Sequence, residues 1–193
     1  GQILWAQPSR LVPVSIVYKR GFEKNGEGKL FLYAYGAYGI AIPPAFNSNR
    51  ISLLDRGWAC AIAHIRGGDD LGYKWFLDGK LTKRTNTFND FVDVTRWLGE
   101  NRYAAKDRIF ARGGSAGGLL MGAVVNQRPE LFRAVVAEVP FVDVVTMMLD
   151  ETMPLTVGEF IEWGNPKIAE QYAWMRAYSP YDNLKPGPYP AML

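Results

Sequence analysis

The sequence predicts an α/β domain with a mostly parallel sheet, and two features of the chain lead to this prediction. Nearly continuous apolar runs occupy residues 29–35 and 58–65, and such runs are typical of strands that are buried on both faces. Residues 87–98 place apolar side chains at spacings of three and four, which predicts an amphipathic helix that covers the sheet. Because strands and helices alternate, we expect parallel strands joined by crossover helices.

The other elements follow from the same patterns, in chain order. Residues 12–18 alternate apolar and polar side chains, which indicates a strand, and residues 48–56 have helical character. A short strand is predicted at 108–112, an apolar helix rich in small residues at 116–126, and a further strand at 134–139. The order of these elements agrees with an α/β sheet.

The end of the chain indicates that part of the domain is missing. Residues 189–193 have the pattern of the first half of an apolar strand, and they follow the turn-rich segment 185–188. Strands seldom stop midway through an apolar run, so we expect a further C-terminal segment. No repeat, low-complexity tract or linker divides the sequence, and residues 1–193 are therefore interpreted as one partial domain.

Composition and charge limit the function classes. With 193 residues, of which 48% are hydrophobic and 21% charged, the chain is expected to pack as a globular domain and not to be disordered. A net charge of +3 gives no indication of a nucleic-acid partner. The short basic run of Lys80, Lys83 and Arg84 is interpreted as a solvated face.

Cysteine usage and hydropathy point to a cytoplasmic location without a membrane span. The single cysteine, Cys60, excludes an internal disulfide, and one histidine is too few to complete a zinc cluster with it. We therefore expect neither a metal nor a cofactor. Glycines and prolines interrupt the longest uncharged stretch, 30–49, so no transmembrane helix is predicted.

The strongest sign of chemistry is a serine between two glycines. Gly113, Ser115 and Gly117 form a Gly-x-Ser-x-Gly pattern, with the strand 108–112 before it and the apolar helix 116–126 after it. This context is typical of a nucleophile elbow, in which a strained turn exposes the serine hydroxyl beside a helix N-terminus. The alternative is a glycine-rich turn that binds phosphate, although the patterns of dinucleotide and nucleotide folds are absent.

A base for this serine is not evident in the sequence. In such folds the order is Ser, then Asp or Glu, then His, but the only histidine, His64, precedes Ser115. We interpret His64 as structural. Asp143, Asp150 and Asp182 follow the serine, and Asp182 lies in a predicted turn, where a turn-forming role is expected.

Seven segments form a series that can be compared with known families. Taken together, they resemble the prolyl oligopeptidase family, most closely its oligopeptidase B group. The resemblance covers almost the whole chain, and the series is far more specific than the serine turn alone. The segments are residues 33–36, 64–68, 86–91, 113–121, 139–143, 162–166 and 178–183.

The resemblance implies an α/β-hydrolase fold, with a mostly parallel sheet and helices on both faces, that is incomplete at the C-terminus. In that family the catalytic domain follows a β-propeller, and the triad acid and histidine would lie after Leu193. The implied activity is that of a serine peptidase acting on peptides, with Ser115 as the nucleophile. Tyr35 and the backbone N–H of Ala116 would stabilise the oxyanion, although Tyr35 is also open to interpretation as a packed aromatic residue.

The resemblance also implies a preference for Arg or Lys before the cleaved bond. Glu159 matches an acidic residue to which the oligopeptidase B group owes this preference, and a buried guanidinium needs a carboxylate partner. Ile161, Pro43 and Ala45 stand where further acids are common, so selection for a second basic residue is expected to be weak. Without the resemblance, Glu159 would be interpreted as a solvated loop acid.

Other functions remain open from the sequence. An esterase or an aminopeptidase could use the same fold, and a non-catalytic hydrolase-fold module could bind a partner. The expected partners are a peptide substrate and the rest of the same enzyme, and the sequence leaves the oligomeric state open.

Overall fold

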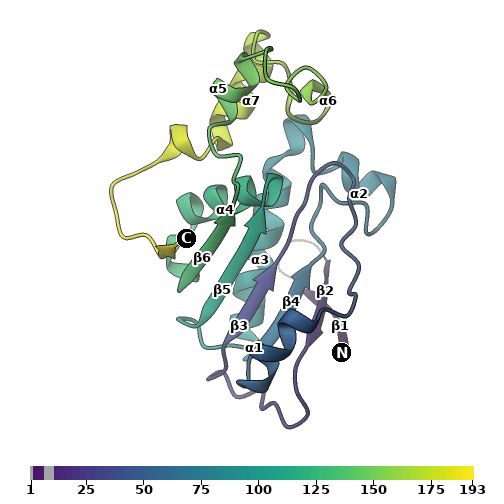
Figure 1. Ribbon diagram of the computed structural model, residues 1–193, viewed down its shortest axis with the longest axis vertical. Coiled ribbons are helices and arrows are strands. Elements are labelled where there is room, and N and C mark those ends of the chain that lie inside the picture. The colour runs from purple at the N-terminus through teal and green to yellow at the C-terminus, as the bar shows by residue number, and fades with distance from the viewer. Residues whose placement is uncertain (1, 7–10) are drawn as a thin grey trace.

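The computed structural model describes residues 2–6 and 11–193, and within these ranges it has one mixed sheet. Seven strands lie in the order β1-β2-β4-β3-β5-β6-β7 (Figure 1). The five strands from β4 to β7 in this order run parallel to their neighbours, whereas β1 and β2 are antiparallel. The prediction of an α/β fold with a mostly parallel sheet is confirmed.

The strands agree closely with the predicted ranges, with one exception. The edge strand β1 was not expected, because it is short and half exposed and shows little periodicity. It pairs antiparallel with β2. The strands are β1 (Gln2–Ala6), β2 (Val12–Val17), β3 (Leu30–Tyr33), β4 (Ala59–Ala63), β5 (Ile109–Gly114), β6 (Ala134–Glu138) and β7 (Ala191–Met192).

The predicted helices are also present, and a cap of short helices is added to them. The apolar stripe predicted within 87–98 is buried along α3, including Phe88, Phe91 and Leu98. The α-helices are α1 (Ile51–Asp55), α2 (Tyr73–Leu77), α3 (Thr85–Glu100), α4 (Ala116–Gln127), α5 (Val144–Leu149), α6 (Phe160–Trp163) and α7 (Ala169–Tyr178). The 3₁₀ helices are η1 (Ser48–Arg50), η2 (Leu81–Lys83), η3 (Pro129–Leu131) and η4 (Tyr181–Asn183).

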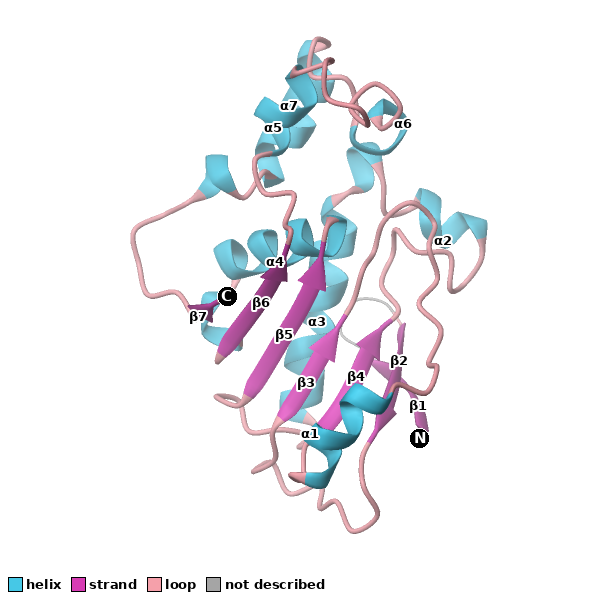
Figure 2. Ribbon diagram, in the orientation of Figure 1, coloured by secondary structure: helices cyan, strands magenta, loops and turns pink. Residues whose placement is uncertain are grey.

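The helices are distributed unequally over the sheet. Figure 2 shows α3 and α4 behind the strands and α1 on the opposite face, near β3 and β4. The carboxyl ends of β3 to β6 point toward α5, α6 and α7, which form a cap at that edge. Because ligands of parallel α/β sheets bind at the carboxyl ends of the strands, this edge is where a site is expected.

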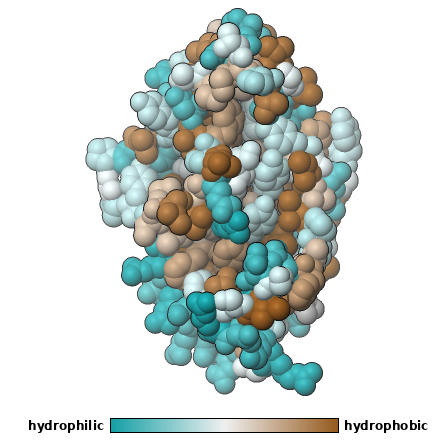
Figure 3. Space-filling view, viewed as in Figure 1, coloured by the Kyte–Doolittle hydropathy of each residue, from teal (hydrophilic) through white to brown (hydrophobic). Residues whose placement is uncertain are grey.

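One face of the sheet is only partly covered, which differs from the expectation of strands buried on both faces. β4 is buried at every position, but burial alternates along β3, where Phe31 and Tyr33 are half-buried. The same alternation occurs along β5, where Phe110 is half-buried and Arg112 is exposed. Figure 3 shows apolar residues in the middle of this face. The reason is that no helix in the described residues lies in front of β5 and β6.

The lengths and hydropathies of the helices test whether any of them could cross a membrane. Among the residues that the structure describes, none of the helices combines the length and the hydropathy needed to cross a bilayer. The uncharged stretch 30–49 instead contains β3 and the loop that follows it.

Candidate active site

Ser115 occupies a sharp turn between a strand and a helix. β5 ends at Gly114 and α4 begins at Ala116, which leaves Ser115 alone at the junction. Its φ is 55° and its ψ is −117°, a backbone conformation that is uncommon for any residue with a side chain. This is the strand-turn-helix geometry expected of a nucleophile elbow.

The neighbouring strand holds this strained turn in place. The backbone N–H of Ser115 donates to the carbonyl oxygen of Glu138 at the end of β6, at 2.9 Å. The carbonyl oxygen of Ser115 accepts from the N–H groups of Gly118, at 2.8 Å, and Phe141, at 3.3 Å. The same carbonyl oxygen accepts the first helical bond of α4, from the N–H of Leu119 at 3.2 Å, so both backbone groups of Ser115 have partners.

Two glycines allow β5, α4 and β3 to approach one another. A Cβ atom at Gly113 would overlap the carbonyl oxygen of Gly117. A Cβ atom at Gly117 would lie 3.1 Å from the carbonyl oxygen of Ala34, which is tighter than ordinary contact. The glycines on either side of Ser115 are thus required by close backbone packing, as the sequence pattern predicts.

Hydrogen-bond donors converge on the space beside Ser115. Tyr35 follows β3, the strand next to β5, and its hydroxyl lies close enough to the Ser115 side chain for the two to interact. Burial raises the pKa of the Tyr35 hydroxyl, and the contact with Ser115 opposes this shift, so Tyr35 is a neutral donor at physiological pH. The N–H of Ala116, the first residue of α4, has no intrahelical acceptor. An oxyanion formed at Ser115 could accept from both groups.

Aromatic side chains form a wall that leads from Tyr35 to the cap. The ring of Tyr38 lies 6.2 Å from that of Tyr35 and 5.6 Å from that of Trp163, which is fully buried. Phe141 packs 5.5 Å from Trp163 on the same wall. The wall connects the turn after β3, the turn after β6 and α6.

Glu159 is held by this wall and is not a freely solvated loop acid. Its Oε1 accepts from the Tyr38 hydroxyl at 3.0 Å, and its Oε2 accepts from Trp163 Nε1 at 2.8 Å. Both donors are uncharged, so they orient the carboxylate without neutralising it. Ile161, by contrast, is 73% exposed, and Pro43 and Ala45 are also exposed.

His64 is engaged elsewhere and cannot act as a base for Ser115 in this arrangement. It follows β4, which is separated from β5 by β3. Its Nε2 lies 2.8 Å from the Ser15 hydroxyl, and its Nδ1 lies 2.7 Å from Asp70 Oδ1. Because both ring nitrogens have partners and the side chain is buried, the structural interpretation of His64 agrees with its contacts.

The first two aspartates after Ser115, Asp143 and Asp150, have local roles. Asp143 caps α5 by accepting from the N–H of Thr146, and Asp150 accepts from the N–H and the hydroxyl of Thr152. Asp182 lies in η4 and is exposed. None of these contacts involves Ser115.

One expectation about charge is wrong. Arg84, interpreted from the sequence as part of a solvated basic run, is 1% exposed and pairs with Glu162 across 3.2 Å. Lys80 and Lys83 are partly or fully exposed, as expected. Arg84 is buried because Glu162, far along the chain, supplies the carboxylate that a buried guanidinium needs. The i, i+3 spacing of Glu159 and Glu162 is the signal that could have placed both acids on one turn.

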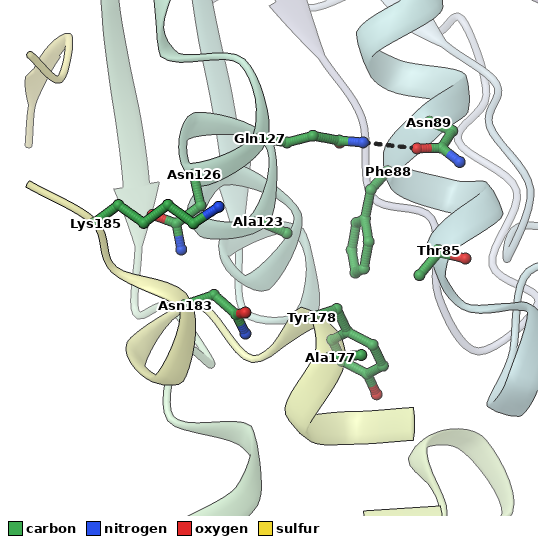
Figure 4. Close-up of a pocket in the computed structure, with 10 residues that line it drawn as sticks. All are labelled: Thr85, Phe88, Asn89, Ala123, Asn126, Gln127, Ala177, Tyr178, Asn183 and Lys185. Atoms are coloured by element: carbon green, nitrogen blue, oxygen red, sulfur yellow. Dashed lines mark hydrogen bonds between the residues drawn. The ribbon is translucent and has the colours of Figure 1, made fainter. Parts of the chain in front are cut away.

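A second hollow lies away from this site. Figure 4 shows it between α3, α4 and α7, with a hydrogen bond from Gln127 to Asn89 across it. Its volume is about 200 Å³. Amide side chains contribute much of its lining, and Ser115, Tyr35 and Glu159 are not part of it. The candidate active site is therefore the space beside the elbow and not this pocket.

Comparison with known proteins finds that the chain is similar to proteins named as peptidases and proteases. The sequence profile described as the prolyl oligopeptidase family matches residues 44–193. A dipeptidyl aminopeptidase BI from Pseudoxanthomonas mexicana is 53% identical over 181 residues, which is 94% of this chain and 25% of that protein. Protease 2 from Moraxella lacunata is 46% identical over 191 residues, which is 98% of this chain and 28% of that protein.

Solved structures agree with these relatives. Oligopeptidase B from Leishmania major superposes with a TM-score of 0.96 and 41% identity, covering 99% of this chain and 27% of that one. Oligopeptidase B from Trypanosoma brucei, with covalently bound antipain, gives a TM-score of 0.94 and 42% identity, with 99% and 27% covered. The likeness confirms the predicted α/β-hydrolase fold. The chain spans about a quarter of the length of these relatives.

The close packing at the elbow leads to a first prediction. Gly113→Ala should destabilise the fold by about 1–3 kcal/mol or more, because the added methyl overlaps the backbone of α4. Gly114→Ala is the matched control, since its Cβ would meet no atom closer than 3.6 Å. Urea unfolding of the two variants measures the difference. Equal stability of the two variants would contradict the close approach.

Proposed function

This chain belongs to the prolyl oligopeptidase family, and on that premise we propose that it is part of the catalytic domain of a serine peptidase that cleaves short peptides after basic residues. The observation that carries the proposal is Ser115 at a strained elbow, with the Tyr35 hydroxyl in contact with it and the N–H of Ala116 beside it. A merely structural serine would need neither the strain nor the converging donors.

The proposed reaction proceeds through an acyl-enzyme. Ser115 Oγ attacks the carbonyl carbon of the scissile bond, and the carbonyl oxygen becomes an oxyanion that accepts from Tyr35 and from the N–H of Ala116. The leaving amine takes a proton, and water then hydrolyses the ester. The serine proton must pass to a base, and His64 is already fully engaged. A histidine and an acid from a segment after Leu193 would fill these roles, as in the Ser-His-Asp arrangement.

The domain organisation is part of the same proposal. Residues 1–193 would form part of an α/β-hydrolase domain, with a β-propeller and the triad acid and histidine in other segments of a longer chain. The support is that the relatives are about four times as long and match this chain over a quarter of their length. The remainder of that enzyme would then be the main partner of this chain, and the single cysteine agrees with a cytoplasmic location.

The proposed specificity rests on Glu159. Its two oxygens accept one neutral donor each, which leaves lone pairs free for a guanidinium or an ammonium group. The faces of the surrounding aromatic rings attract the same cations. Since the exposed Ile161, Pro43 and Ala45 supply no second carboxylate, one basic residue before the scissile bond is the proposed requirement.

A second candidate function is that of an aminopeptidase. It is favoured by one observation, the 53% identity to a protein named a dipeptidyl aminopeptidase. The chemistry at Ser115 would be the same, and the difference would lie in how the substrate's amino terminus is held. Cleavage of amino-terminally blocked substrates separates the two, because an endopeptidase accepts them and an aminopeptidase does not.

The missing base predicts that residues 1–193 alone do not hydrolyse peptides at a useful rate. Without a full triad, an oxyanion hole and substrate binding leave only ~10³- to 10⁴-fold acceleration over water. The measurement compares hydrolysis of an arginyl amide by this chain and by the full-length enzyme, with Ser115→Ala of each as the blank. Rapid turnover by the chain alone, abolished in its Ser115→Ala variant, would show that the base lies within these residues.

The contact between Tyr35 and Ser115 predicts an effect on kcat. In the full-length enzyme, Tyr35→Phe should lower kcat by about 10²- to 10³-fold with little change in KM, because the hydroxyl stabilises charge that exists only in the transition state. Since burial raises the pKa of Tyr35, this contribution should persist through neutral pH and be lost only as the pH rises through that raised pKa. Steady-state kinetics across pH provide the test, and an unchanged kcat would refute the role.

The position of Glu159 predicts substrate preference. Glu159→Gln should lower kcat/KM for an arginyl substrate by roughly 10- to 100-fold, since a hydrogen bond to a charged group contributes about 1.5–3 kcal/mol. The value for a matched phenylalanyl substrate should change little. Glu170→Gln, at an exposed acid of α7, is the control. A full-length enzyme that prefers Phe or Pro, or an arginine preference unaffected by Glu159→Gln, would exclude this pocket assignment.

A further inference from the structure

A fully buried arginine lies directly behind the aromatic wall. Arg84 is 1% exposed, and its guanidinium packs 4.4 Å from the centre of the Trp163 ring and 5.8 Å from that of Phe88. Its Nη1 donates to the carbonyl oxygen of Gly79 at 2.8 Å. Within the part of the chain that the structure describes, its Nε and Nη2 have no hydrogen-bond partner. Two unmet donors on a buried cation are costly, so stability alone does not explain this residue.

Arg84 is connected to Glu159 through a chain of contacts. Its Nη1 also donates to Glu162 Oε1, at 3.2 Å, and Glu162 is 2% exposed. The same oxygen accepts from the backbone N–H of Tyr38, at 3.1 Å, and the Tyr38 hydroxyl donates to Glu159. Trp163 separates Arg84 from Glu159, because its ring contacts the guanidinium and its Nε1 bonds the carboxylate. One cation and two anions therefore share one network.

The three charges do not act equally on a molecule in the site. The charges of Arg84 and Glu162 largely cancel at a distance, because they are opposite and form a close pair. The carboxylate of Glu159 is the one left uncompensated. The field that an incoming side chain meets is then that of a single negative charge.

We propose that Arg84 and Glu162 are specificity-determining residues that act as a neutralised pair, so that the pocket at Glu159 presents one net negative charge to the substrate. This inference rests on the proposed function. Neither residue needs to touch the substrate, and both act by setting the field around Glu159 and the position of Tyr38. Arg84 without Glu162 would repel a basic side chain, and Glu162 without Arg84 would attract it.

The surroundings of Glu162 determine how it would respond to loss of Arg84. Burial raises the pKa of Glu162, and Arg84 opposes this shift. Without Arg84 the pKa would rise further, so the carboxyl would be neutral at lower pH and charged only as the pH rises through that value. The charged and titratable groups that face Glu162 are Arg84, Lys80, Glu159, Tyr38 and Tyr178.

Opposite effects of the two single substitutions test the proposal. In the full-length enzyme, kcat/KM is measured for matched arginyl and phenylalanyl substrates, and their ratio is compared between variants. Glu162→Gln should lower the ratio by about tenfold, because the cation of Arg84 is then uncompensated. Arg84→Met should raise the ratio by about tenfold at alkaline pH, where Glu162 is ionised, and less at acidic pH. The double variant should return the ratio to near the wild-type value with no added pH step.

A control variant at an exposed cation accompanies these measurements, and two kinds of result would contradict the proposal. Lys83→Met removes a cation from the same segment, but the Lys83 side chain is 53% exposed and pairs with Asp78 at 2.8 Å, so its charge should be screened at Glu159 and the ratio should not change. If one of the two single variants fails to fold, the direction in which the other changes the ratio still tests the proposal. Equal losses on both substrates, or shifts of the same sign in both single variants, would assign the pair a purely structural role. A wild-type enzyme without arginine preference would instead refute the proposed function.

Discussion

The backbone of Ser115 is held from two sides. Its N–H donates to Glu138 at the end of β6, and its carbonyl oxygen accepts from Phe141 in the turn that follows. These bonds stabilise a φ of 55°, a conformation that costs on the order of 1–3 kcal/mol for a residue with a side chain. The contact with Tyr35 and the place of Ala116 at the helix start both depend on this conformation. β6 thus supports the site without supplying a side chain that reacts.

The sheet order brings the parts of the site together. β3 and β5 are neighbours, so the turn after β3 meets the elbow after β5 although other elements separate them in the sequence. The turn after β3 carries Tyr35 and Tyr38, which face in two directions: one contacts Ser115, and the other bonds Glu159 in the cap. A single loop therefore links the reacting serine to the residue proposed to select substrates. Any shift of this loop would change rate and preference together.

Local patterns explain what could be predicted from the sequence. The apolar stripe of α3 and the strand-turn-helix around Ser115 are visible within short windows, and both are present as expected. β1 could not be predicted, because Gln2–Ala6 is half exposed and gains its structure from pairing with β2. Arg84 could not be placed either, since its burial depends on Glu162, which no local window includes. The periodicity of apolar residues predicts helices and strands, but it does not predict which charged residues pair across long stretches of the sequence.

The pair of Arg84 and Glu162 also constrains how these two positions can evolve. Replacing either residue alone would leave an uncompensated charge in a fully buried place, at a cost of about 3–5 kcal/mol, which is a large part of the stability of a typical domain. Replacing both by apolar residues of similar volume is close to neutral by the same reasoning. A lineage therefore loses least stability when both positions change together. The two positions should therefore be inherited as a unit, and related chains should carry both charges or neither.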